Sequence, residues 1–467
     1  MIINEYEEYL IENEDLPESW QSQNALDELE EFLQSNWEQR TVFYEDNKIE
    51  SRQQFLKFLS HSNVKTQNYI GTIVFKGEQL NIFPKVFGKH RGYRHTENLS
   101  QEHLLQNLIR WLEYCTRISY PFINVSAELS DSQNLKELFM TLYVGYVRSA
   151  IERGLYFQYV DETNDTSCIK GKFDIKDYYI NKIPNGQSNN FRCTYSTFEF
   201  DNIINRVIKY TCKVILNSTE SKKNQNAIRK ILARLNDVSD VQCKPSDCDN
   251  IRLSRMKSQY RVIMSMSKMF LLNKTSNYVM DTTESFCFLF PTELLFEGFI
   301  GGFMQDLIEA KGGKVYLQKS ELHLINDIRF GERSLGAAFT LKHDILVEYN
   351  GKVFILDTKY KQVDRFADDP DGVRRLIKDE VNQHDVYQVC EYARMRGAED
   401  VYLLYPMYRF EDNEPENPWG ESIGEGKTIN VHFIRLPFIF EDNEEHTKQQ
   451  LSSVINELFN IGQNKDS

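Results

Sequence analysis

The chain has 467 residues, 41% of them hydrophobic and 27% charged, and carries a formal net charge of −14. This length suffices for two or three domains with cores of their own, and the composition is that of a soluble globular protein. No apolar run reaches the roughly 18 residues that a membrane span needs, and the acidic N-terminus excludes a secretory signal or transit peptide.

The negative charge is concentrated at the N-terminus. Residues 1–50 contain fifteen Asp and Glu but only Arg40 and Lys48 as counter-charges, a balance of −13. The other 417 residues therefore sum to −1. This near-neutral remainder leaves room for basic patches of the kind that bind nucleic acid.

Eight cysteines are scattered along the chain, and the closest pair, Cys243 and Cys248, does not form a Cys-x-x-Cys motif. The sequence also lacks paired histidines, so we do not expect a zinc site. We expect reduced thiols and a cytoplasmic protein.

The pattern of apolar residues predicts an α+β multidomain fold that begins with a small, acidic, β-rich domain at 1–100. Two apolar runs within 69–85 flank Lys76-Gly77-Glu78, which predicts a hairpin. Residues 27–33 favour a turn or two of helix, and the polar stretch 89–102 is typical of a linker.

A mainly helical middle domain is expected over residues 101–284. Apolar stripes at 104–112 and 135–146 predict two helices that pack on a core, and a third helix is expected at 198–216, with Asp201 capping or pairing locally. A basic helix is expected at 251–275, where cations occur with no acid among them; four of them are Arg252, Arg255, Lys257 and Arg261. These cations either contact phosphate or form a solvated face over a core.

A C-terminal mixed α/β domain is expected over 285–440, followed by a short helix and polar tail at 441–467. A helix is predicted from Thr292, as N-cap, to residue 307, and Glu297 lies among its apolar residues and so needs a partner. Another helix is predicted at 382–397, ended by Gly397. Strands are predicted at 314–317, 323–325, 401–405 and 429–435.

The stretch 341–361 carries the strongest signal in the C-terminal domain. Two apolar runs flank Asn350-Gly351, and a two-residue loop there places Asp344 directly opposite Asp357. Two opposed carboxylates repel each other unless a divalent cation lies between them. Lys359 lies on the same face, since side chains two apart on a strand point the same way. The alternative is a half-buried hairpin whose charged face is merely solvated.

Two further segments bear on function. In the helix at 382–397, Asp385, Gln388 and Tyr392 lie on one face. Residues 420–428 include Gly426-Lys427-Thr428 but do not fit a P-loop, because the preceding glycine is one residue too far away and a strand follows where a helix is required. We expect a hairpin loop there and no nucleotide-binding site in the chain.

The spacing of Asp344, Asp357 and Lys359 resembles the PD-(D/E)XK nuclease signature. Residues 356–361, Leu-Asp-Thr-Lys-Tyr-Lys, resemble more closely the core of the McrC family, the nuclease subunit of McrBC-type GTP-dependent restriction systems. Shorter pieces between about 69 and 409 are also similar to McrC. His343 stands where the signature has a proline, which is not a metal ligand.

The resemblance implies a PD-(D/E)XK nuclease domain that cuts DNA with Mg²⁺, for which Mn²⁺ is a substitute. Asp344 and Asp357 would hold the metal, and Glu297 would add an oxygen ligand. Lys359 would stabilise the attacking hydroxide or the phosphorane. The supporting residues would be Asp385, Gln388, Tyr392 and Lys361, of which Gln388 and Tyr392 would position the DNA strand.

The resemblance also implies two partners, double-stranded DNA and a McrB-like AAA+ GTPase hexamer. The hexamer would recognise methylated cytosine and dock on the N-terminal region, and the chain alone would be inert. Two alternatives stay open: a non-catalytic adaptor that stimulates an AAA+ partner, and a PD-(D/E)XK nuclease with a different motor or trigger. A dead site has no reason to keep a destabilising carboxylate pair, which argues against the adaptor.

Overall fold

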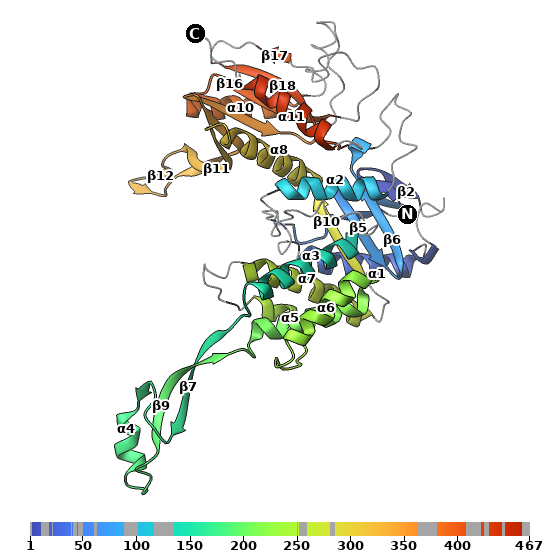
Figure 1. Cartoon of the computed structure of the whole chain (residues 1–467). Helices are drawn as coiled ribbons and strands as arrows, with labels where there is room; N and C mark the ends of the chain where they lie inside the picture. Colours follow the sequence, from blue (N-terminus) through green and yellow to red (C-terminus); the bar gives the residue numbers. More distant parts are fainter. Residues whose placement is uncertain are drawn as a thin grey trace. The chain divides into compact units, whose positions relative to one another are not determined.

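The computed structural model divides the chain into two compact units, residues 1–135 with 283–467, and residues 136–282 (Figure 1). The structure describes residues 2–10, 18–20, 22–38, 40, 44, 50–59, 63–87, 101–115, 135–249, 251, 259–280, 285–361, 381–407, 422–424, 429–440 and 444–459. It is a mixed α/β multidomain protein.

The predicted N-terminal hairpin is present in the first unit. Strands β5 (Tyr69–Phe75) and β6 (Glu78–Phe83) pair antiparallel around Lys76 and Gly77, both of which have positive φ. Strand β1 (Ile2–Asn4) adds to β6 in parallel, and β10 (Phe286–Pro291) adds to β5 antiparallel. The strand that opens the C-terminal region therefore completes the N-terminal sheet.

The rest of the N-terminal region contains more regular structure than the sequence predicted. Helix α1 (Gln23–Glu38) extends well beyond the predicted turn or two, because its buried Ala, Leu, Phe and Trp side chains pack in a core. A second sheet has the order β2-β4-β3, formed by Glu8–Leu10, Asn63–Thr66 and Leu56–Leu59. Short 3-10 helices occupy Glu18–Trp20 (η2) and Lys85–Phe87 (η4), and most of the expected linker at 89–102 lies outside the described residues.

The C-terminal region contains a six-stranded mixed sheet of order β11-β14-β15-β16-β18-β17. Its strands are β11 (Lys314–Ile325), β14 (Ala338–Tyr349), β15 (Lys352–Thr358), β16 (Asp400–Met407), β17 (Ser422–Gly424) and β18 (Asn430–Pro437). Strand β16 runs parallel to β15 and to β18, and the other neighbouring pairs are antiparallel. At the tip of β11 and β14, β12 (Arg329–Phe330) pairs with β13 (Arg333–Ser334).

Helices pack on both faces of this sheet (Figure 1). Helix α10 (Gln383–Arg396) packs Val389, Tyr392 and Ala393 against buried strand residues of one face. Helices α8 (Thr292–Glu309) and α11 (Glu444–Leu458) are the other helices beside the sheet, α8 next to β14 and α11 next to β18. The face that bears Asp344 and Asp357 is thus buried further along, at Leu346 and Ile355.

Several sequence predictions about the C-terminal region need correction. Thr292 is not the N-cap of α8, a place taken by Pro291; the Thr292 hydroxyl instead donates to the Glu5 carboxylate. The strands predicted at 314–317 and 323–325 are one strand, β11, with a register irregularity between Lys319 and Leu322. As expected, Gly397 closes α10 with a left-handed φ.

Glycines in α8 allow another helix to approach closely. Helix α2 (Gln101–Tyr114), which the sequence analysis assigned to the middle domain, lies in the first unit and packs on α8. A Cβ atom on Gly302 would lie 2.0 Å from the carbonyl oxygen of Tyr114, and one on Gly298 would lie 2.2 Å from Cys115 Sγ. These contacts explain why a helix that positions Glu297 contains glycines.

Among its described residues, the second unit combines four long helices with a long two-stranded ribbon. The helices are α3 (Leu135–Glu152), α5 (Ile203–Ser218), α6 (Lys222–Arg234) and α7 (Gln259–Met280). Strands β7 (Gln158–Thr166) and β9 (Phe191–Glu199) form the ribbon, and β8 (Lys172–Phe173), α4 (Ile175–Asp177) and the π-helix at Tyr178–Lys182 lie towards its tip. In Figure 1 the ribbon projects from the helices of its own unit.

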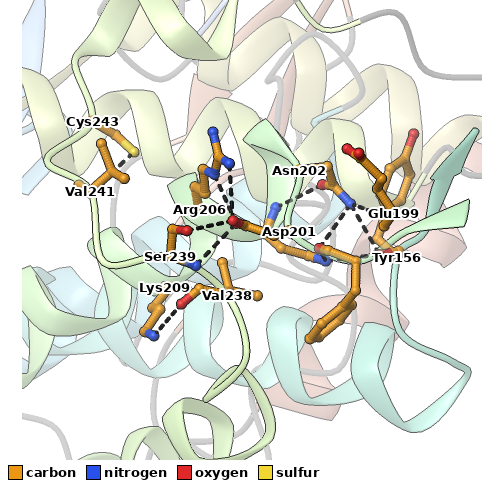
Figure 2. Close-up of polar contacts among 12 residues, drawn as sticks. Tyr156, Glu199, Asp201, Asn202, Arg206, Lys209, Val238, Ser239, Val241 and Cys243 are labelled. Atoms are coloured by element: carbon orange, nitrogen blue, oxygen red, sulfur yellow. Dashed lines mark hydrogen bonds and ion pairs between the residues drawn. The ribbon is translucent and has the colours of Figure 1, made fainter. Parts of the chain in front are cut away.

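The helix predicted at 198–216 begins later than expected, because residues up to Glu199 belong to β9. Asn202 is the N-cap of α5 and accepts from Asn205 N at 3.1 Å. Asp201 pairs locally, as expected: it accepts from Arg206 Nε at 2.8 Å and from Ser239 N at 3.0 Å (Figure 2). These donors, Arg206 first, hold the pKa of Asp201 well below its ordinary value, so this carboxylate is structural.

Two expectations about the whole chain agree with the described residues. Within them, no helix is both long and apolar enough to cross a membrane. All eight cysteines are free thiols.

Candidate active site

The hairpin of β14 and β15 has the predicted register. Tyr349 pairs with Lys352 and Ile345 with Leu356, and the turn residues Asn350 and Gly351 have φ values of 49° and 76°. Such positive values are typical of the two-residue turn that the Asn-Gly sequence favours. Asp344 and Asp357 each lie one residue beyond the Ile345–Leu356 pair, at opposed positions of neighbouring strands.

Lys359 lies against the Asp357 carboxylate. Its Nζ atom is 2.6 Å from Asp357 Oδ2, and the Asp357 side chain is only 4% exposed. Burial and the neighbouring Asp344 carboxylate raise the pKa of Asp357 to about 7, against the lowering effect of Lys359. Burial lowers the pKa of Lys359, but the Asp357 and Asp385 carboxylates outweigh it and hold this pKa above its ordinary value.

Asp344 is oriented by hydrogen bonds on both sides. Its Oδ2 atom accepts from the main-chain nitrogen of Thr358 at 3.0 Å and from the Thr358 hydroxyl at 3.1 Å. Its Oδ1 atom accepts from Gln318 Nε2 at 3.4 Å. Gln318 lies across from Asp344 on β11, between the pairs Leu317–Ile345 and Lys319–His343.

Gln318 also links Glu297 to Asp344, because its amide nitrogen donates to Glu297 Oε1 as well. Glu297 on α8 therefore has the partner that its apolar surroundings require, and it lies one hydrogen-bonded side chain away from Asp344. Gln318 was not among the residues predicted from the sequence. Its φ of 53° is rare for a residue other than glycine, and no sequence motif indicates it.

Asp385, at the start of α10, holds both lysines of the Lys359-Tyr360-Lys361 segment. Its Oδ1 atom lies 3.7 Å from Lys359 Nζ, and its Oδ2 atom lies 2.7 Å from Lys361 Nζ. The helix begins there because Asn382 caps it by accepting from His384 N. Ion pairs, hydrogen bonds and neighbouring strand positions thus bring together six of the predicted residues, namely Asp344, Asp357, Lys359, Lys361, Asp385 and Glu297.

Gln388 and Tyr392 bond to each other one turn apart on the same helix. Gln388 is exposed, and its Nε2 atom lies 2.8 Å from the Tyr392 hydroxyl. Tyr392 is buried, with its ring centroid 4.7 Å from that of His343. His343 itself is fully buried, which lowers its pKa and favours the neutral ring. Histidine therefore serves as a packing residue at the position where the nuclease signature has proline.

The charges of this cluster suit a divalent cation. When ionised, the carboxylates of Asp344, Asp357, Asp385 and Glu297 carry −4, and Lys359 with Lys361 returns +2, which leaves −2. Within the described residues, no three Asp, Glu, His or Cys side chains already form a group with metal-ligand spacing. Mg²⁺ prefers to bind one or two carboxylates, with water and substrate phosphate completing its coordination. These residues therefore fit Mg²⁺ better than zinc.

Comparison with known proteins identifies the family. A family described as "McrBC 5-methylcytosine restriction system component" matches residues 64–406. The chain belongs to the McrBC family. A search of curated proteins finds no match.

Two solved structures are similar to this McrBC family member. The first is a chain from a refined half-complex of a tetradecameric assembly of Thermococcus gammatolerans McrB AAA+ hexamers with bound McrC. It is 16% identical, with a TM-score of 0.63, over 97% of this chain and 99% of that one. The second, from the T. gammatolerans McrBC complex, is 18% identical with a TM-score of 0.48, over 66% of this chain and 88% of that one. At such identity the first likeness supports the fold alone.

The DNA-binding residues predicted in the basic helix are only partly described. Arg261 is exposed on α7, whereas Arg252, Arg255 and Lys257 lie outside the described residues. Lys268 on the same helix pairs with Asp249 at 2.6 Å, so this helix is not free of counter-charge. Of the predicted hairpin loop at 420–428, the structure describes only β17, which pairs antiparallel with β18. The other residues of that loop, Gly426-Lys427-Thr428 among them, lie outside the described residues.

Proposed function

We propose that this McrBC family member is a Mg²⁺-dependent DNA endonuclease subunit with a PD-(D/E)XK site. The observation that carries the proposal is the register of the β14–β15 hairpin, which brings Asp344 and Asp357 to opposed positions with Lys359 against Asp357. Mn²⁺ would serve as a substitute for Mg²⁺, because both are hard ions that take oxygen ligands.

Each residue of the cluster has a role in phosphodiester hydrolysis. Asp344 and Asp357 would hold the metal, and Glu297, oriented by Gln318, would add an oxygen directly or through water. The metal, when bound, supplies polarisation of the phosphate and a water molecule of lowered pKa. The Lys359 ammonium would stabilise charge on the attacking hydroxide or the phosphorane.

The remaining predicted residues would bind or position DNA. Asp385 would hold Lys359 and Lys361 at the edge of the site, and the exposed Gln388 would contact the strand. Tyr392 would act through its bond to Gln388, since its ring is buried. Arg252, Arg255, Lys257 and Arg261 would contact DNA phosphates.

The test is cleavage of a methylated supercoiled plasmid by the full chain with Mg²⁺, GTP and an added McrB-like AAA+ GTPase. Asp357→Asn should abolish cleavage, and Asp237→Asn, an exposed carboxylate of the second unit, should leave it unchanged. Cleavage that survives Asp357→Asn would favour the non-catalytic adaptor. Cleavage by wild type without the GTPase would keep the nuclease and point to a different trigger.

We also propose that the partner is a McrB-like hexamer that acts on methylated DNA. The family description names 5-methylcytosine restriction, and the similar T. gammatolerans assembly contains McrB hexamers with bound McrC. The N-terminal region is the docking surface predicted from the sequence, and this stays a prediction.

The ribbon of the second unit is a second candidate for docking. Its described residues expose large apolar side chains, namely Tyr159, Ile169, Ile175, Tyr179, Ile180, Ile183 and Phe198. Tyr159 is 72% and Tyr179 is 66% exposed, which a solvated surface does not require. A concentration of such residues on one projecting element is typical of a protein-binding surface.

The two docking surfaces can be separated by measuring the affinity of the full chain for the GTPase. Ribbon docking predicts that Tyr179→Ser with Ile180→Ser weakens binding at least tenfold, while Lys57→Glu on the exposed side of β3 has no effect. Docking through the N-terminal region predicts the reverse. All these side chains are exposed, so the melting temperature should change little in either variant.

A further inference from the structure

Glu5 is a buried carboxylate that the proposed chemistry does not use. It follows β1 and is only 1% exposed. Its Oε1 atom accepts from Lys85 N at 2.9 Å and from the Tyr360 hydroxyl at 2.7 Å, and its Oε2 atom accepts from the Thr292 hydroxyl at 2.7 Å. Burial of a carboxylate is costly without such donors, so these three bonds decide where the side chain lies.

The three donors belong to three different parts of the first unit. Lys85 follows the N-terminal strand β6. Thr292 is the first residue of α8, the helix that carries Glu297. Tyr360 lies between Lys359 and Lys361, directly after β15. A single carboxylate therefore joins the N-terminal sheet to two of the elements that carry the candidate active site, α8 and the segment after β15.

Tyr360 is the contact nearest to the proposed chemistry. It is buried, and its ring packs against Phe296 and Phe438, with centroids 6.1 Å away in each case. Lys85 Nζ donates to the Tyr360 carbonyl oxygen at 2.9 Å and lies 4.4 Å from the centre of its ring. The Tyr360 residue is thus held at its hydroxyl by Glu5 and at its main chain by Lys85.

The position of Tyr360 determines the positions of its two neighbours. The side chains of Lys359 and Lys361 both pair with Asp385, whereas the hydroxyl of Tyr360, which lies between them in the sequence, donates to Glu5. A shift of the Tyr360 main chain would therefore move the Lys359 ammonium relative to Asp357. Catalysis is sensitive to such shifts, because a displacement of about 1 Å can cost on the order of a hundredfold in rate.

We propose that Glu5 is a positioning residue for the nuclease, which holds Tyr360 so that Lys359 lies at the reacting phosphate. This inference rests on the proposed function. It makes the first β-strand of the chain a part of the catalytic apparatus without any contact of its own to metal or DNA. Glu5 would act on the chemical step, not on the binding of metal or DNA.

Tyr360→Phe tests the inference, since it removes the hydroxyl that bonds Glu5 and keeps the ring. The matched control is Tyr143→Phe in the second unit, which also removes one buried hydroxyl bond, to Ser267 at 3.0 Å. We expect Tyr360→Phe to lower kcat for plasmid cleavage roughly tenfold, with KM for DNA and the affinity for Mn²⁺ unchanged. Tyr143→Phe should leave kcat unchanged and lower the melting temperature by a similar amount.

Glu5→Gln, alone and combined with Tyr360→Phe, completes the test. If both act through one bond, the double variant should lose no more kcat than the more impaired single variant. The inference would be contradicted if the losses of kcat in the two single variants multiply in the double variant. It would also be contradicted if Tyr360→Phe retains the wild-type kcat. Different results would contradict the proposed function itself: no cleavage by wild type, or cleavage by Asp357→Asn.

Discussion

The Lys359 ammonium lies 2.6 Å from Asp357 Oδ2, on a carboxylate whose pKa is nevertheless raised to about 7. Burial and Asp344 outweigh the lysine, so one cation does not neutralise the site. This imbalance is the physical reason to expect a second, divalent cation there, and it has consequences for stability as well as for catalysis.

Asp357→Asn should stabilise the metal-free protein at alkaline pH. The pKa of Asp357 is about 7 in the folded chain, against an ordinary value of 3.8. Between pH 3.8 and pH 7 the folded chain therefore keeps a proton on Asp357 that the unfolded chain loses. Its contribution to the free energy of unfolding therefore falls as the pH rises through this window. We expect the variant to melt about 2–4 °C higher than wild type at pH 8 in EDTA, with a smaller difference at pH 5.

Calorimetric scans of both proteins at the two pH values measure this difference, and Asp237→Asn is the control. Mg²⁺ at pH 8 should raise the melting temperature of wild type and not that of Asp357→Asn. If Asp357→Asn has a lower melting temperature than wild type at pH 8, then the surroundings stabilise the ionised Asp357 carboxylate. This result would contradict the prediction.

Lys359 and Lys361 should differ in importance, although both pair with Asp385. The Lys359 side chain is 18% exposed and lies against Asp357, whereas Lys361 is 41% exposed. Lys359→Met should lower kcat for cleavage about 10²–10³-fold, as loss of a group that stabilises transition-state charge does. Lys361→Met should lower it less than tenfold. Single-turnover cleavage measures both, and equal losses would remove the special role of Lys359.

Gln318→Ala should weaken metal binding without touching a proposed ligand. The Gln318 amide orients both Glu297 and Asp344, and loss of such a supporting bond typically costs about 10–100-fold in metal affinity. Titration with Mn²⁺ measures this affinity. The control is Gln305→Ala, which removes a side-chain amide that makes an exposed bond to Glu309; both residues lie on α8. Equal affinities for the two variants would show that Gln318 does not organise the site.

Gly302→Ala should destabilise the contact between α2 and α8. The added Cβ would meet the Tyr114 carbonyl oxygen at 2.0 Å, a main-chain atom that cannot move aside alone. Overpacking of this kind costs about 1–3 kcal/mol. Gly145→Ala in α3 is the control, because its Cβ would meet nothing within 4 Å and alanine favours helix by up to about 1 kcal/mol. Urea unfolding should therefore shift in opposite directions for the two variants.

The sequence predicts the β14–β15 hairpin well because local rules decide it. Asn350-Gly351 specifies the turn, and the turn fixes the register that opposes Asp344 and Asp357. The α10 helix, its Gly397 end and the position of Asp385 near its start also follow from local signals.

Long-range contacts could not be predicted in this way. Gln318 reaches Asp344 only because β11 pairs with β14, and no local pattern marks its positive φ. Glu5 reaches Tyr360 across 355 residues of sequence. The burial of both sheet faces depends on helices that pack from distant segments, so the hairpin sequence alone does not predict it. The long ribbon was missed because its exposed strands lack a buried apolar face.

The most direct test of the central claim is calorimetric titration of Mg²⁺ and Mn²⁺ into the full-length wild type and Asp357→Asn, with plasmid cleavage followed in parallel. The account predicts binding to wild type that Asp357→Asn abolishes, and cleavage that appears with the GTPase partner and disappears with the same substitution. Metal binding and cleavage that are both unchanged in Asp357→Asn would contradict it.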